Sequence, residues 1–107
     1  MSLDLMLEHA RTGTALIEEG WSQGRATFGG VVGALMLARA TALVADPARV
    51  LRAATVSFVR PVATGDVTLD GELLRAGPAV TQARVTLLQE GRPAAAMQVS
   101  FGLPRQS

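Results

Sequence analysis

Two adjacent glycines stand immediately before an apolar segment, in the stretch FGGVVGALMLA that runs from Phe28 to Ala38. If a helix starts at this pair, the N–H groups of Gly29 and Gly30, unobstructed by Cβ atoms, could hold a carbonyl oxygen and stabilise a developing oxyanion. Alternatively, the glycines only allow the turn into the helix and close packing on a sheet. Phe28 is interpreted as a core or pocket-wall residue. Both interpretations of the glycines stay open at this point.

Four other polar side chains could take part in binding or catalysis. Gln89 precedes a Glu-Gly turn and could orient a water or bind a carbonyl oxygen, or it is simply a solvated side chain. Ser57 and Thr55 lie two residues apart and face the same way on a strand, where hydroxyl groups are usually structural. Arg60 could bind a phosphate through its planar donors, or it is an ordinary exposed arginine at a strand end.

The chain lacks the residue combinations that several common catalytic mechanisms require. His9 is the only histidine and has no Asp or Ser at the spacing of a catalytic triad. Glu18 and Glu19 are adjacent, so on a strand they point to opposite faces and cannot act as a carboxylate pair. The apolar segment 30–44 contains neither an acid nor a histidine, and the chain has no cysteine. These residues therefore argue against a catalytic triad, a thiol nucleophile and a thiolate metal site.

Composition indicates one domain that does not stay a monomer. The chain has 107 residues, of which 49% are hydrophobic and 18% charged. This length is typical of a single domain. The apolar share exceeds what a small monomer readily buries, so we expect a homodimer or a higher homo-oligomer.

Charge and hydropathy argue against nucleic-acid and membrane partners. All ten basic residues are arginine, but nine acids bring the net charge to +1, and the arginines are scattered along the chain. A nucleic-acid-binding protein needs a clustered basic face. The apolar run 31–45 is interrupted by Arg39 and is shorter than the roughly 20 residues of a membrane span. Without cysteines or a signal peptide, the cytoplasm is the expected location.

Hydrophobic periodicity predicts one long helix and five strands. Residues 30–45 are apolar around almost the whole circumference, so this helix must be enclosed, and Asp46-Pro47 ends it. Residues 1–13 form a short helix or an arm. On the second strand, Val50, Ala54, Val56 and Phe58 are expected to share one face. The strands are expected at 14–19, 50–60, 66–75, 80–89 and after Pro93, with a hairpin turn at Glu90-Gly91.

One sheet can cover such a helix only by curling around it. The prediction is therefore an α+β hotdog fold: a curved antiparallel five-stranded sheet wrapped around one long central helix, in a single domain over 1–107. One copy still leaves part of the helix and a sheet edge uncovered, and pairing with a second copy would hide both.

Five segments together resemble the first hotdog repeat of the acyl-CoA thioesterase II family, over roughly residues 14–103. They occur in matching order and with similar spacing, and the set is more specific than any one of them. The resemblance implies hydrolysis of acyl-CoA thioesters to free acid and CoA, with no metal or redox cofactor. The segments are FGGVVGALMLARA (28–40), VSFVRP (56–61), LLRAG (73–77), LLQEGRP (87–93) and VSFG (99–102).

Two departures from the family limit what the resemblance implies. Family members usually carry two repeats, and this chain is expected to stop where the first repeat ends. The family's catalytic acid, hydroxyl and glutamine belong to the second repeat. When the family's motif is aligned with this chain, the acid falls near Gly30 and the hydroxyl near Leu51, so both are missing. Only the glutamine is present, as Gln89.

The working hypothesis is a homodimer that hydrolyses acyl-CoA, with the acyl chain between the two central helices. Gly29 and Gly30 would bind the thioester oxygen, Gln89 would place water, and the general base is unassigned. Phe28, Ser57 and Arg60 would bind substrate. The alternative is a non-catalytic half that binds acyl-CoA or pairs with a separate catalytic hotdog subunit, and the acid-free helix favours it.

Overall fold

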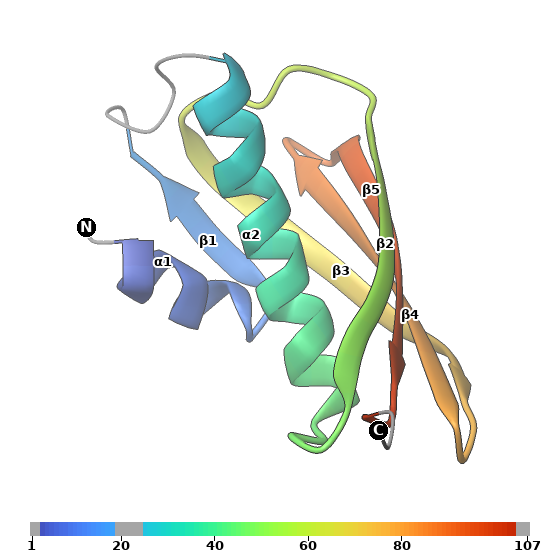
Figure 1. Ribbon diagram of the computed structural model, residues 1–107. Helices are drawn as coiled ribbons and strands as arrows, with labels where there is room; N and C mark the ends of the chain where they lie inside the picture. The colour runs from blue at the N-terminus through green and yellow to red at the C-terminus, as the bar shows by residue number, and fades with distance from the viewer. Residues whose placement is uncertain (1–2, 19–24, 105–107) are drawn as a thin grey trace.

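The computed structural model describes residues 3–18 and 25–104, without the side chains of 25–28. All neighbouring strands are antiparallel, in the order β1-β3-β4-β5-β2. The sheet curves around α2, and α1 lies beside β1 (Figure 1). The elements are α1 (Leu3–Ala10), β1 (Thr14–Ile17), α2 (Arg25–Val44), β2 (Val50–Phe58), β3 (Gly65–Ala76), β4 (Val80–Gln89) and β5 (Arg92–Gly102). The predicted architecture of one long helix in a curved five-stranded antiparallel sheet is confirmed.

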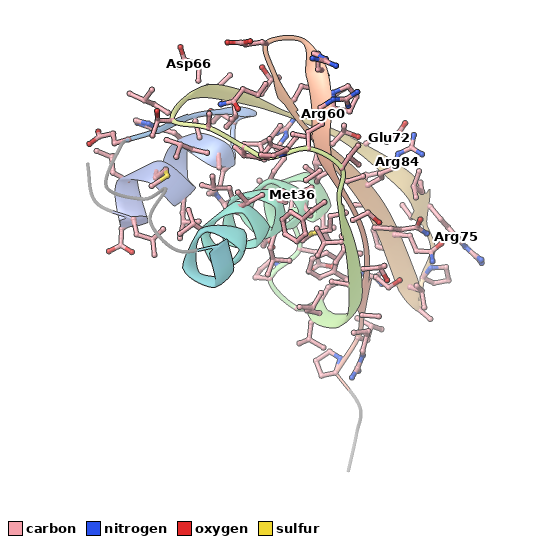
Figure 2. The ribbon with its side chains drawn as sticks, turned by 90° about the horizontal axis from the view of Figure 1, so that it is seen from above. Met36, Arg60, Asp66, Glu72, Arg75 and Arg84 are labelled. Carbon is pink, nitrogen blue, oxygen red and sulfur yellow. The ribbon has the colours of Figure 1, made fainter. Side chains whose placement is uncertain are left out.

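The core lies between α2 and the inner face of the sheet. Strand residues alternate between the two faces, and those facing α2 are apolar, as the period of two predicts. Met36 points from α2 toward the sheet, whereas Arg84 and Glu72 lie on the outer side of the sheet (Figure 2). Fully buried members of the core include Met6, Ile17, Leu35, Met36, Leu69, Val85, Leu87 and Val99.

The central helix begins earlier than predicted. It starts at Arg25, five residues before Gly30, and it ends at Val44, followed by Ala45 with a φ of 55°. The expectation that the glycine pair marks the start was wrong. A glycine inside a helix costs only about 1 kcal/mol relative to alanine, an amount that tertiary packing readily outweighs. The end before Asp46-Pro47 agrees with the prediction.

The strand boundaries differ from the expected ones by a few residues. β1 ends at Ile17, while Glu19 lies outside the described residues. β2 ends at Phe58 rather than Arg60. β5 begins before Pro93, because the register shifts between Leu87 and Leu88 and this irregularity accommodates the proline. The short N-terminal helix is confirmed as α1.

A bulge changes the face on which β2 begins. Leu51 pairs with Phe101, but Ala53 pairs with the next residue, Ser100, so Arg52 is the extra residue. Because a bulge reverses the alternation, Leu51 shares the inner face with Val56 and Phe58, and Val50 does not. The prediction that Val50 belongs to this face was wrong.

Arg39 interrupts the apolar helix because it binds backbone carbonyls at the edge of β3. Its Nε donates to the Leu69 carbonyl oxygen at 3.2 Å and its Nη1 to the Arg11 carbonyl oxygen at 2.9 Å. Pairing of β3 with β1 ends at Thr68, so Leu69 lies just past the ladder. Its own N–H donates to the Gly13 carbonyl oxygen at 2.7 Å. Arg39 thus joins α2, β3 and the turn after α1.

Replacing Arg39 by methionine is expected to lower the free energy of unfolding by about 1–2 kcal/mol, because two carbonyls lose a charged donor. Urea denaturation followed by circular dichroism measures this difference. Arg92→Met is the matched control, since Arg92 is an exposed arginine at the start of β5. Equal stability of the two variants would show that the bonds of Arg39 contribute nothing to the fold.

Candidate functional site

Gly29 and Gly30 are the fifth and sixth residues of α2. Only the first four N–H groups of a helix lack an intrahelical acceptor, so the free amides belong to the turn that starts at Arg25. The two glycines nevertheless leave the helix surface bare. Among the residues that the structure describes, a Cβ atom at Gly30 would meet nothing within 4 Å, and one at Gly29 would meet the Phe58 ring at 3.8 Å. Gly30 is exposed.

Phe58, rather than Ser57, is the β2 residue that lies beside these glycines. Phe58 pairs with Ala95 on the inner face, and its side chain is 55% exposed. No motif pointed to it, although the alternation of β2 already placed it on the face opposite the hydroxyl groups. The structure therefore adds an aromatic ring next to Gly29 that was not among the predicted site residues.

Ser57 and Thr55 lie on the outer face of the sheet. Together with Ser100 and Arg84 they line an open hollow of about 400 Å³ over β2, β5 and β4. Arg84 also forms an ion pair with Glu72 there. The sheet separates this hollow from Gly30, so within one chain Ser57 does not join the helix glycines in one site.

Arg60 lies at the edge of the sheet, just after β2. Its Nη1 donates to the Pro93 carbonyl oxygen at 2.9 Å, and its backbone N–H donates to the Ala94 carbonyl oxygen at 3.1 Å. The side chain is exposed, so its remaining donors face solvent. This geometry is compatible with binding an anionic group.

The amide of Gln89 is bound in both directions to the backbone of Ala63. The Ala63 N–H donates to Gln89 Oε1 at 2.8 Å, and Gln89 Nε2 donates to the Ala63 carbonyl oxygen at 2.8 Å. These two bonds fix the orientation of the amide, and they use one of its two N–H donors and one of the two lone pairs of Oε1. The sequence could not reveal this pairing, because the partner lies 26 residues away.

Other kinds of site are not found in the part of the chain that the structure describes. Within residues 3–18 and 25–104, no three His, Cys, Asp or Glu residues gather as metal ligands would. No described helix is both long enough and apolar enough to cross a bilayer. The side chain of Phe28 lies outside the described residues, so its predicted place in a pocket wall stays a prediction.

An apolar surface runs along one side of α2 and onto β2, and we call it the open face. It consists of Gly30, Ala34, Leu37 and Thr41 of α2 with Val56 and Phe58 of β2. Gly30 and Thr41 are exposed, Ala34 and Leu37 are half-buried, and all nine residues of β2 are exposed. The two elements meet where the Phe58 ring lies 3.8 Å from the position that a Cβ atom of Gly29 would take. The expected enclosure of the helix is thus incomplete in one chain.

Comparison with solved structures finds the same fold repeatedly. A hypothetical thioesterase of Streptococcus pneumoniae with coenzyme A has a TM-score of 0.75 at 17% identity, over 87% of this chain and 77% of that one. A protein of Streptococcus mutans bound to acetyl-CoA has a TM-score of 0.75 at 14% identity, over 87% and 79%. These likenesses confirm the hotdog fold.

A third structure differs in length. The proposed thioesterase II of Thermobifida fusca has a TM-score of 0.74 at 22% identity, covering 94% of this chain but only 42% of that chain. No curated protein matches. The model of the acyl-CoA thioesterase N-terminal domain matches residues 17–102, which is most of the chain. With its fold and this match in agreement, the chain belongs to the acyl-CoA thioesterase N-terminal domain family.

Proposed function

We propose that this protein binds and hydrolyses acyl-CoA thioesters on the open face. The observation that carries the proposal is the bare helix surface at Gly29 and Gly30, with the Phe58 ring beside Gly29, in a member of this family. An apolar surface with a few polar groups beside it suits an acyl chain with a polar head. The coenzyme A and acetyl-CoA in two structures of the same fold support this class of ligand.

In the proposed reaction, water adds to the thioester carbonyl, the C–S bond breaks, and the acid and the CoA thiol are released. The oxyanion formed on the way needs preorganised donors. The free amides of the first turn of α2 supply them, at the positive end of the helix dipole, and Gly29 and Gly30 leave room for the thioester. Arg60, at the end of β2, is proposed to bind a CoA phosphate.

A homodimer completes this site in the proposal. The open face is uncharged, and an exposed edge strand with apolar side chains is normally covered. A second copy would cover β2 and bring a second α2 opposite the first, with the acyl chain between them. This chain covers 42% of the Thermobifida fusca chain, so that longer chain has room for a second unit of this size.

The alternative function is a non-catalytic half that binds acyl-CoA, or that pairs with a separate catalytic hotdog subunit. One observation favours it: α2 carries no Asp, Glu or His between Arg25 and Val44, so the helix offers no general base. The Gln89 side chain is held by two hydrogen bonds to the backbone of Ala63, which favours a structural role for it over a role as a reacting group.

The direct test is release of free thiol from acetyl-, hexanoyl- and dodecanoyl-CoA, followed with a chromogenic thiol reagent. Hydrolysis clearly above the rate in buffer is expected for at least one ester. Calorimetric titration with CoA accompanies the assay. Binding without hydrolysis would favour the non-catalytic half, and neither binding nor hydrolysis would overturn the proposed function.

A further inference from the structure

The loop between β2 and β3, residues 59–64, is hydrogen-bonded at both ends to the hairpin formed by β4 and β5. At its start, the N–H groups of Val59 and Arg60 both donate to the Ala94 carbonyl oxygen, at 2.8 and 3.1 Å. At its other end, the backbone of Ala63 forms two hydrogen bonds with the Gln89 side chain, both at 2.8 Å. Val62, between these anchors, packs against the core.

The far anchor depends on one property of the glutamine side chain. A glutamine amide offers an acceptor and a donor side by side, so it can pair with a peptide unit as a neighbouring strand does. A carboxylate accepts only, and a lysine or arginine donates only. Gly65, which follows the loop with a φ of 126°, lies against the same amide: a Cβ atom there would stand 3.9 Å from Gln89 Nε2.

The loop leads directly to the open face. Its first residue follows Phe58, whose ring stands 3.8 Å from the Cβ position of Gly29. Without the bonds to Ala63, the backbone from Arg60 to the start of β3 would lose its far anchor. The end of β2 would then hold Phe58 less firmly against α2.

We propose that Gln89 is a positioning residue, which fixes the loop 59–64 through the backbone of Ala63 and so sets the Phe58 side of the acyl-CoA site. This inference rests on the proposed function for its second half only. In this role Gln89 does not contact water or substrate itself. It acts on the site through the loop.

Gln89→Glu tests the inference, because its effect should depend on pH. The ionised carboxyl cannot donate to the Ala63 carbonyl oxygen and is repelled by it, whereas the protonated carboxyl can restore both bonds. Folding therefore raises the pKa of the introduced carboxyl above its ordinary value of about 4.3. The folded variant then binds more protons than the unfolded chain, so its deficit is smallest at low pH and grows as pH rises through the raised pKa.

Two measurements are expected to follow this titration. At pH 7.5, the melting temperature of Gln89→Glu should lie about 5–10 °C below that of the unmodified protein, and most of this gap should close at pH 4.5. The dissociation constant for CoA should rise about fivefold at pH 7.5 and return toward the unmodified value at low pH. For Gln89→Met, the melting temperature should fall and the dissociation constant for CoA should rise by the same amounts at both pH values.

Gln98→Glu is the matched control, since it makes the same chemical change at an exposed position of β5. It should shift the melting temperature by no more than about 2 °C, as exposed charges contribute little. A pH-independent gap for Gln89→Glu, or no gap, would overturn the role in fixing the loop. A pH-dependent gap with unchanged CoA affinity would overturn the positioning of the site. Failure of the unmodified protein to bind CoA would count against the proposed function. The stability measurement would then still test whether Gln89 fixes the loop 59–64.

Discussion

Replacing Gly30 by valine is expected to weaken acyl-CoA binding and to lower kcat/KM at least tenfold without unfolding the protein. Within the described part of the chain, the added side chain enters open space, because a Cβ atom at this position meets nothing there within 4 Å. Valine is also a better helix former than glycine by a few tenths of a kcal/mol. A loss of binding must therefore come from the ligand side of the helix. Titration with acetyl-CoA and thermal unfolding, measured on the same sample, check both parts.

Gly33→Val is the control for Gly30→Val, since its Cβ position is equally free and lies one turn further along α2. Because Gly33 is not part of the open face, this variant should hardly change the binding of either acetyl-CoA or dodecanoyl-CoA. Gly30→Ala should give an intermediate effect on both esters. Unchanged affinity and kinetics for Gly30→Val would remove this glycine from the site.

The fold could be predicted because its signals repeat along the chain. A helix without a polar side must be buried, here against a sheet. The alternation of apolar and polar residues on each strand indicates which face of the sheet packs on the helix. The inner-face residues Leu69, Val85 and Val99 are buried as this alternation requires. Errors arose where a single residue decides the geometry. The bulge at Arg52 moved Val50 off the inner face, and no periodic pattern announces one extra residue.

The site was harder to predict than the fold, because it depends on contacts between distant residues. Gln89 was singled out for its place before a Glu-Gly turn, but its amide is occupied by Ala63. Ser57 was singled out for its hydroxyl group, although its strand turns it to the outer face. Gly30 was chosen as the start of a helix that in fact begins at Arg25. Gly30 still leaves a bare surface on the helix, because glycine has no Cβ atom wherever the helix begins.

A charge on the inner face of β2 should separate the proposed dimer. Val56→Lys is expected to raise the dimer dissociation constant about a hundredfold or more, because an uncompensated charge buried at an interface costs about 3–5 kcal/mol. Val56 is 38% exposed in the single chain, so the lysine can reach solvent there and the fold itself should tolerate it. Analytical ultracentrifugation over a range of concentrations measures the change.

Val80→Lys is the matched control for this variant, with the same substitution at a valine that is 42% exposed but lies on β4, two strands away from the β2 edge. It should leave the dimer intact. If Val56→Lys is folded and stays dimeric, the interface does not include the inner face of β2. The two results also bear on the reaction, since an acyl chain held between two helices needs both copies. A monomeric Val56→Lys should therefore bind dodecanoyl-CoA at least tenfold more weakly, whereas full affinity in the monomer would place the whole acyl site within one chain.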